Sequence, residues 1–147
     1  MEITKEKYTI NTDHDKLDID FIHNYLSVYS YWAKEIPVAI VVKAIENSLC
    51  FGLYEGDKQI GFARMVTDKA TFAYMADVFI DEHYRGRGLS KWLVATMLAH
   101  PDMQGLRRLM LATRDAHGLY TQFGFTPITN PERLMQMVFP DIYKKKP

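Results

Sequence analysis

Apolar residues recur along the chain with two different spacings, and the spacing changes several times. Between residues 15 and 30 they lie three and four apart, which predicts an amphipathic helix. Pro37 pushes Ile36 out of helical geometry and predicts the start of a second helix that runs to about Asn47. Before these helices, Tyr8 to Ile10 form one short β-rich run. We therefore expect a strand followed by two helices.

The next part of the chain has the turn residues and apolar runs of β-structure. Residues 49–54 predict a strand, residues 55–58 a hairpin turn and residues 59–67 its partner strand. A second turn, at residues 67–69, leads to a strand over residues 71–80. Both alternating sets of the segment 59–67 are mostly apolar, which is typical of a sheet that is covered on both faces.

Helical spacing returns in the last third of the chain. Leu89, Leu93 and Met97 recur four apart and predict a helix that ends near Ala99, before Pro101.

Residues 107–112 then predict a strand, and residues 116–123 a short helix. Gly124 suits the left-handed position past the end of that helix. Residues 125–128 and 134–139 predict two final strands. Strands in series with helices inserted between them indicate an α/β domain with a mixed sheet.

Composition limits the class of protein. The 147 residues, 48% of them hydrophobic, fit a single domain over residues 1–147. The formal charge is zero and the pI is about 7.0, which argues against nucleic acid or a membrane surface as a partner. No run reaches the roughly 20 apolar residues that cross a bilayer. The basic tail, Lys144 to Lys146, is expected to fray.

Cysteine and histidine usage argues against a disulfide and against a metal site. Cys50 is the single cysteine, which excludes an internal disulfide and a CxxC metal site. The five histidines have no paired ligand spacing, so no metal is expected. The N-terminus lacks the apolar core of a signal peptide, which favours a cytoplasmic location.

Candidate chemistry lies between the strand over residues 71–80 and the following helix. The connecting sequence is Arg85-Gly86-Arg87-Gly88. At a helix start, unpaired N–H groups and the positive end of the helix dipole favour an anion. Guanidinium groups match phosphate oxygens, so the turn predicts a site for a phosphorylated small molecule. The alternative is a tight turn whose arginines are solvated.

Two common phosphate motifs do not fit this turn. A Walker loop needs Lys followed by Ser or Thr at its spacing, and a dinucleotide fingerprint needs a third glycine. The turn resembles instead the signature of the GNAT superfamily of acyl-CoA-dependent N-acyltransferases, Arg/Gln-x-x-Gly-x-Gly/Ala after a strand. Arg85, Gly88 and Ser90 occupy its three defined positions, with Ser90 in place of Gly or Ala.

A second segment, residues 113–125, is similar to another GNAT signature, Asn-x-x-Ala-x-x-Leu-Tyr-x-x-x-Gly-Phe. Thr113 stands where the family often has Asn. The other defined positions are all matched: Ala116, Leu119, Tyr120, Gly124 and Phe125. Two signatures in the right order are far more specific than either alone.

The resemblance implies a GNAT-like acyl-CoA N-acyltransferase fold, in which a central, mostly antiparallel sheet of six to seven strands is flanked by about four helices. It also implies acetyl-CoA as the co-substrate, with its pyrophosphate on the basic turn and its thioester held by strand N–H groups. The cofactor-binding residues implied in this way are Val78, Phe79, Ile80, Arg85, Gly86, Arg87, Gly88, Leu89, Ser90 and Tyr120.

Amine attack on a thioester requires a proton for the departing thiolate and a base for the amine. The family commonly uses the Tyr matched by Tyr120 as general acid. A phenol with an unperturbed pKa of about 10 can give a proton to a thiolate whose conjugate thiol has a pKa of about 8.5. Asp77 is the first candidate for the base, and His117, Asp115 and Glu82 are weaker candidates. Asp77 could equally form an ion pair with Arg64 on the adjacent strand.

Four further residues are candidates for binding the acceptor. Tyr31 and Trp32 lie between the two N-terminal helices and form either a wall for the acceptor or a plug in the core. Arg64 and Tyr74 interrupt apolar strand positions, so they either pair with other polar groups or face a cleft.

Together these features predict an N-acetyltransferase that moves an acetyl group from acetyl-CoA to a primary amine of a small molecule or peptide. A non-catalytic acyl-CoA-binding or sensing module is the alternative from another class. A scaffold that binds no nucleotide is the third. The expected partner is the amine acceptor, and a homodimer is left open.

Overall fold

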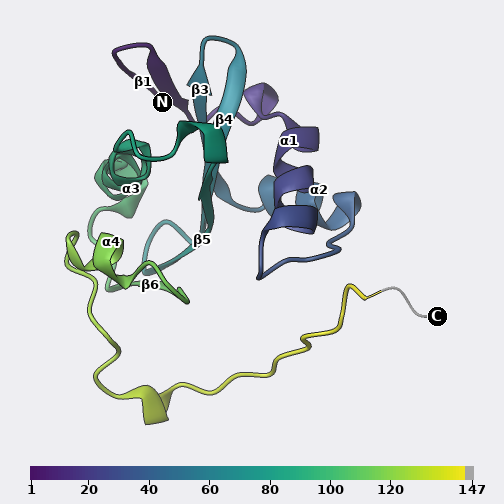
Figure 1. The fold of residues 1–147 in the computed structure, drawn as a ribbon. Coiled ribbons are helices and arrows are strands. Elements are labelled where there is room, and N and C mark those ends of the chain that lie inside the picture. The colour runs from purple at the N-terminus through teal and green to yellow at the C-terminus, as the bar shows by residue number, and fades with distance from the viewer. Residues whose placement is uncertain (145–147) are drawn as a thin grey trace.

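Six strands form one sheet in the order β1-β2-β3-β4-β5-β6 in the computed structural model, which describes residues 1–144 (Figure 1). Neighbouring strands are antiparallel except for the parallel pair β5 and β6. The strand bounds are β1 Glu2–Lys5, β2 Tyr8–Asn11, β3 Leu49–Glu55, β4 Lys58–Thr67, β5 Phe72–Ile80 and β6 Arg108–Leu111.

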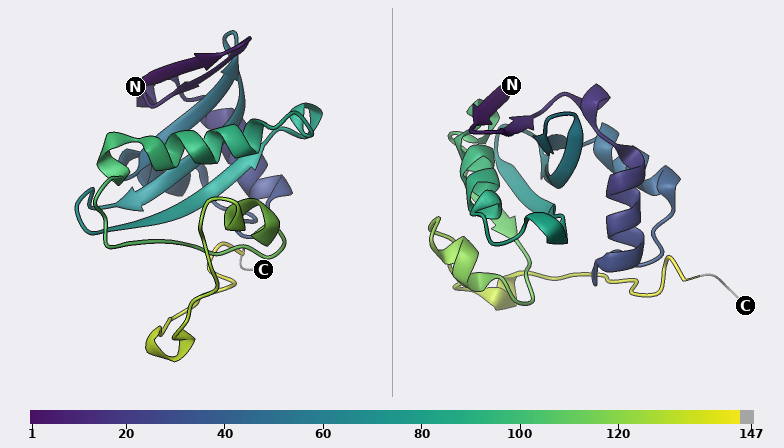
Figure 2. Two further views of the ribbon diagram at one scale, coloured as in Figure 1. Left: turned by 90° about the vertical axis from the view of Figure 1, so that its left-hand side faces the viewer. Right: turned by 45° about the horizontal axis from the view of Figure 1, so that its top comes forward.

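Helices cover both faces of this sheet (Figures 1 and 2). One face carries α1 (Ile19–Asn24), which continues as the π-helix η2 (Tyr25–Tyr29), and α2 (Val38–Glu46). The other face carries α3 (Leu89–Ala99) and α4 (His117–Thr121). Short 3₁₀ turns complete the set: η1 His14–Lys16, η3 Glu82–Tyr84, η4 Pro101–Met103 and η5 Pro131–Arg133.

Two apolar clusters hold the layers together, one on each face of the sheet. The larger joins the sheet to α3 and includes fully buried Leu93 and Met97, two of the residues spaced four apart. The smaller joins α1 and α2 to Phe62 and to Cys50, which is a core residue as expected. Burial raises the pKa of the Cys50 thiol to about 12, so the thiol is not a nucleophile.

The predicted mixed sheet and the GNAT-like architecture are confirmed, as are the strands over residues 49–54, 59–67 and 71–80. The hairpin strand β1 was not predicted, because every residue in it is exposed and the apolar pattern gives no sign of it. None of the helices within residues 1–144 is both long and apolar enough to cross a bilayer.

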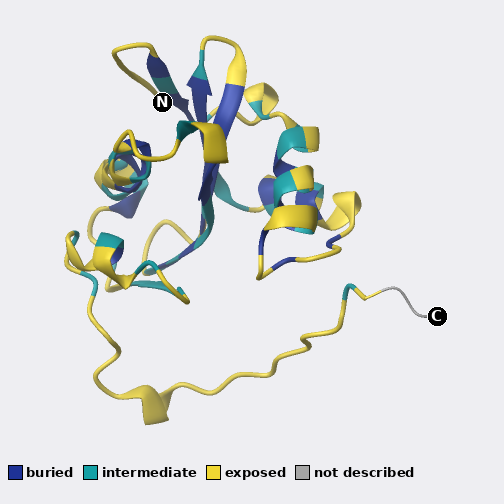
Figure 3. Cartoon of the chain, in the orientation of Figure 1, coloured by how far each residue is buried: buried dark blue, intermediate teal, exposed yellow. Residues whose placement is uncertain are grey.

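The prediction of two final strands is wrong. Residues 126–144, which we call the C-terminal arm, contain no strand and leave the body in an extended course (Figures 1 and 3). Its one helical turn is η5. The arm begins beside α4, and Tyr143 near its end packs against the apolar cluster of α1 and α2. The expected fraying of the basic tail lies outside the described residues beyond Lys144.

Strand β5 contains a bulge that shapes the site. Phe62 of β4 pairs with Phe79, but Arg64 pairs with Ala76, so β5 has one extra residue between these pairs. Asp77 lies in that bulge with a φ of 54°, in the left-handed region. A bulge breaks the ladder locally and re-aims the side chains beside it.

Candidate active site

The start of α3 leaves its backbone amides exposed in a tight turn. Gly86 and Gly88 have φ values of 78° and 76°, which L side chains rarely adopt. A Cβ at either position would meet no atom within 4 Å, so conformation and not crowding requires glycine. No side chain caps α3, and its first intrahelical bond runs from Trp92 N–H to the Gly88 carbonyl. The N–H groups before Trp92 therefore remain available to an anion.

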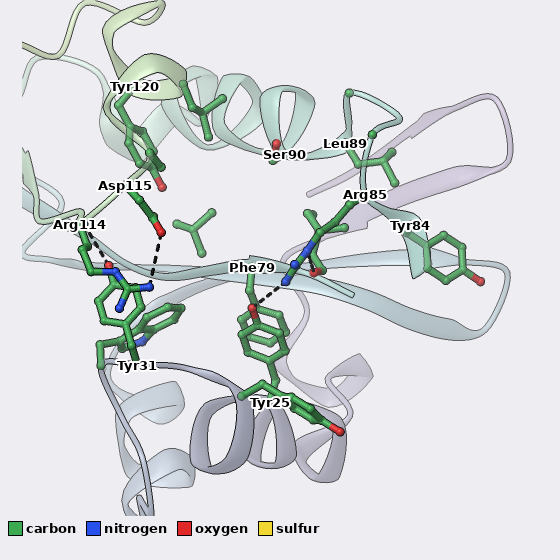
Figure 4. A pocket seen from close by; sticks show the side chains of 18 residues that line it. Tyr25, Tyr31, Phe79, Tyr84, Arg85, Leu89, Ser90, Arg114, Asp115 and Tyr120 are labelled. Carbon is green, nitrogen blue, oxygen red and sulfur yellow. Dashed lines mark hydrogen bonds and ion pairs between the residues drawn. The ribbon is translucent and has the colours of Figure 1, made fainter. Parts of the chain in front are cut away.

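The two arginines of the turn point to different places. Arg85 donates from Nη2 to the Tyr25 hydroxyl at 3.1 Å and from Nε to the Ile80 carbonyl at 3.3 Å, and it lines a cavity (Figure 4). Arg87 lies outside this cavity. Its Nη1 donates to the Tyr8 hydroxyl at 2.9 Å, and its guanidinium stacks on Tyr84. Of the two, only Arg85 faces the site.

A cavity of about 560 Å³ runs from this turn to α4 (Figure 4). It lies between β5 and α3 on one side and the aromatic residues of η2 and the following loop on the other. Nine of the ten predicted cofactor-binding residues line it: Val78, Phe79, Ile80, Arg85, Gly86, Gly88, Leu89, Ser90 and Tyr120 come together, and Arg87 does not.

A second cavity, of about 550 Å³, adjoins the first. All four residues expected to bind the acceptor line it: Tyr31, Trp32, Arg64 and Tyr74. Asp77 and Tyr120 line it as well. The residues common to both cavities are Tyr31, Trp32, Val78, Arg114, Asp115, Ala116 and Tyr120. The two cavities therefore meet at Tyr120.

Tyr120 is a buried side chain at the boundary of the two cavities. Its side chain is 8% exposed, and within the part of the chain that is described its hydroxyl makes no hydrogen bond. Burial, and secondarily the nearby Tyr31, raises the pKa of the Tyr120 phenol. The phenol is therefore protonated at neutral pH, as an ordinary tyrosine is, and the raised pKa makes it a weaker acid than an exposed one.

The carboxylate of Asp77 is held from two sides. One oxygen accepts from Trp32 Nε1 at 2.7 Å, and the other accepts from Arg64 Nε at 2.6 Å. Arg64 also donates from Nη1 to Ser48 Oγ at 3.0 Å. The ion pair expected as the alternative for Asp77 is thus present. Arg64 and Asp77 are paired, and together with Tyr74 they also line the second cavity.

The two N-terminal aromatic candidates form a wall and not a core plug. Tyr31 and Trp32 are 43% and 42% exposed, and they contact each other edge to face. Tyr25, which the sequence did not single out, stacks flat on Phe79 with ring centroids 3.8 Å apart. All four rings line the first cavity, and Tyr31 and Trp32 also line the second.

Arg114 closes the site from the opposite side and was not predicted. Its guanidinium lies 3.9 Å from the centre of the Tyr31 ring, and its backbone N–H donates to the Tyr31 hydroxyl at 3.1 Å. This contact joins the loop before α2 to the loop before α4. Arg114 occupies an undefined position of the second signature, and nothing in the local pattern marks it. The weaker base candidates His117 and Glu82 are exposed.

Comparisons with known proteins find similar sequences and a similar fold. The profile described as Acetyltransferase (GNAT) family matches residues 19–125. A Gibberella zeae protein with a provisional acetyltransferase name is 32% identical over 139 residues, which cover 80% of this chain and 77% of that protein. A crystal structure from Xanthomonas campestris pv. campestris, assigned to the GNAT family, is 49% identical with a TM-score of 0.93, covering 97% of this chain and 100% of that one.

The Xanthomonas match extends beyond the body of the fold. Residues 126–144 are roughly one eighth of the chain, so a superposition of that extent includes most of the C-terminal arm. A Mycobacterium tuberculosis protein solved in complex with CoA is more distant, with 16% identity and a TM-score of 0.67 over 81% of this chain and 72% of that one. It shares the fold.

Proposed function

Because this chain belongs to the GNAT acetyltransferase family, we propose that it transfers an acetyl group from acetyl-CoA to a primary amine of a small molecule or peptide. The main support is the position of Tyr120, where a cavity that begins at unbonded helix amides meets a second cavity, which Arg64 and Asp77 line. One cavity suits the thioester donor, and the other suits the acceptor.

Acetyl-CoA fits the residues of the first cavity. The amides at the start of α3, together with Arg85, supply N–H donors and positive charge for a pyrophosphate. From there the cavity follows the end of β5 toward Tyr120. Val78, Phe79 and Ile80 would hold the pantetheine arm and polarise the thioester carbonyl through their backbone groups. The distantly related Mycobacterium protein binds CoA on the same fold.

The proposed reaction is a direct attack. The amine nitrogen forms a bond to the thioester carbonyl carbon, and the carbon–sulfur bond breaks. The Tyr120 hydroxyl donates its proton to the departing thiolate, and the amine loses one proton to a base. No metal takes part in this scheme. The products are an acetylated amine and CoA.

Asp77 is the base in this proposal, directly or through a water molecule. It lies on the wall of the acceptor cavity, and each carboxylate oxygen keeps a lone pair beyond its bond to Trp32 or Arg64. Tyr31, Trp32, Arg64 and Tyr74 would surround the acceptor. The proposal also places the enzyme in the cytoplasm.

The test is release of free CoA thiol from acetyl-CoA in the presence of a panel of amines. We expect release with some amines and none without an amine. A protein that CoA protects against thermal unfolding but that releases no thiol with any amine would be a binding module instead. A protein that CoA does not protect would contradict the donor site itself.

A further inference from the structure

The charges that line the second cavity cancel one another. Among residues 1–144, the charged side chains that line it are Arg64, Asp77, Arg114 and Asp115. Arg64 is paired with Asp77 at 2.6 Å. Arg114 is paired with Asp115 at 3.5 Å. The cavity therefore has two cations and two anions, and each cation has an anion beside it.

The deeper pair is not available to a charged acceptor. The side chains of Arg64 and Asp77 are 19% and 11% exposed, and Arg64 also donates to Ser48 Oγ. Breaking a largely buried ion pair leaves one charge without a partner, which is costly. A carboxylate or phosphate on the acceptor would have to take Arg64 away from Asp77, so we expect neither group to bind there.

The outer pair offers little to a charged acceptor. The side chains of Arg114 and Asp115 are 64% and 67% exposed, and the guanidinium lies 3.9 Å from the centre of the Tyr31 ring (Figure 4). An anion near Arg114 would also be repelled by Asp115, and exposed ion pairs contribute little free energy. A charged group would therefore lose water in the cavity without gaining an unpaired partner.

The rest of the lining is aromatic and apolar. Apolar group burial is favourable against such a surface, and ring faces also attract an ammonium group. Tyr31 and Trp32 contact each other edge to face and are each more than two fifths exposed, so a ligand in the cavity could cover them. The aromatic residues are Tyr31, Trp32, Tyr74 and Tyr120, and the apolar ones are Met75, Ala76, Val78, Leu111, Ala112 and Ala116.

We infer that the acceptor is a small primary amine whose only charged group is the amine itself and whose remaining part is aromatic or otherwise apolar. This inference rests on the proposed function, because it takes the second cavity as the acceptor site. The apolar part would lie against Tyr31, Trp32 and Tyr74, with the amine directed to Asp77 and Tyr120. Specificity then comes from the aromatic rings and from the absence of an unpaired charge among the described lining residues.

The first experiment compares ligands that differ in one feature. 2-Phenylethylamine, ethylamine, L-phenylalaninamide and L-phenylalanine are titrated calorimetrically into the full chain, with and without CoA, at about pH 6, where the amines are protonated. We expect 2-phenylethylamine to bind at least about 10-fold more tightly than ethylamine, which has no ring. L-Phenylalaninamide should bind at least about 10-fold more tightly than L-phenylalanine, which has the same ring and a carboxylate. Equal or reversed affinities in either pair, or no binding of 2-phenylethylamine, would overturn the inference.

The second experiment removes one ring from the cavity. Tyr74→Ala should weaken the binding of 2-phenylethylamine about 10-fold and leave that of ethylamine within a factor of about two. The matched control is Tyr29→Ala, since Tyr29 lines the first cavity but not the second, and it should change neither affinity. An equal loss for both amines in Tyr74→Ala would contradict the placement of the ring. The comparison of ligands in the wild type does not depend on this variant.

The third experiment removes the anion beside Arg114. Asp115→Asn should strengthen the binding of L-phenylalanine about three-fold, because Arg114 then lacks its neighbouring anion, and leave L-phenylalaninamide unchanged. Arg114→Gln should keep the preference for L-phenylalaninamide. If the wild type instead prefers L-phenylalanine and Arg114→Gln removes that preference, Arg114 binds an anionic group of the acceptor and the inference is wrong.

The inference and the proposed function fail in different ways. Release of no CoA thiol with any amine would contradict acetyl transfer, whereas the order of ligand affinities tests the second cavity alone. Thiol release that is fastest with an anionic amine would leave acetyl transfer intact and overturn the apolar acceptor.

Discussion

The two cavities that meet at Tyr120 are built in different ways. The donor cavity depends on backbone: two left-handed glycines, the free amides of α3 and the end of β5, all within residues 78–90. The acceptor cavity depends on side chains from separate segments, held by the contacts of Asp77 with Trp32 and Arg64 and of Arg114 with Tyr31. In the proposed function, donor recognition is therefore largely local in the sequence, whereas acceptor recognition is assembled by the fold.

The largest effect should come from Tyr120, which lines both cavities. Tyr120→Phe removes the proton donor but keeps the ring, so kcat should fall about 10³-fold while CoA affinity stays within a factor of about two. Steady-state kinetics and calorimetry measure the two quantities. Tyr54→Phe, which alters a hydroxyl bonded to the Lys16 carbonyl, is the control. Since burial raises the pKa of Tyr120, wild-type activity that depends on its protonated form should persist beyond the pH of about 10 at which an ordinary phenol ionises. Unchanged turnover in the variant would remove Tyr120 from its role.

On the acceptor side, Asp77→Asn should lower kcat/KM for the amine about 10²-fold, because the amide cannot take the amine proton. CoA affinity should not change, since Asp77 does not line the donor cavity. Steady-state kinetics, in which the concentrations of acetyl-CoA and of the best amine of the panel are varied in turn, measures the effect on the amine and the effect on the cofactor separately. A variant that loses CoA binding equally would contradict the division between the cavities.

On the donor side, Gly88→Glu should weaken CoA binding about 10²-fold, because it adds a strained left-handed side chain and a negative charge beside the pyrophosphate site. Gly105→Glu is a matched control, since Gly105 has a φ of 77° and an equally open surrounding but lies outside both cavities. Calorimetric titration with CoA gives the affinities. Wild-type affinity in Gly88→Glu would exclude the turn as the pyrophosphate site.

The smallest effects distinguish the two arginines of the turn. Arg85→Ala should weaken CoA binding about 10-fold through loss of a charge-assisted contact. Arg87→Ala should change CoA binding less than about two-fold, because its guanidinium is turned to Tyr8 and Tyr84. Calorimetric titration of both variants with CoA at the same ionic strength measures the two affinities. The opposite order would mean that Arg87 turns into the cavity when CoA binds.

Most of the elements could be predicted because their signals are local. Helix α2 begins after Pro37 and α3 after Gly88, as the sequence indicates, and the hairpin of β3 and β4 forms at the expected turn. The donor residues also came together, since consecutive positions on a strand, a turn and a helix need no distant contact to be neighbours.

The C-terminal arm shows where local signals fail. Residues 134–139 have the composition of a strand, but a strand exists only when another edge accepts its hydrogen bonds. The pattern of apolar residues does not specify which edge that is, or whether it belongs to the same copy of the chain. Arg114 was missed for a related reason: its partner, Tyr31, is 83 residues away.

The sequence by itself determined the family, the sheet with helices between its strands, and the glycine turn before α3, because these follow from residues that are close together in the chain. Only the tertiary structure decided that Arg85 and not Arg87 faces the cavity, that Asp77 is bonded to both Trp32 and Arg64, and that the arm leaves the body. These outcomes depend on contacts between distant segments, and such contacts have no fixed spacing in the sequence.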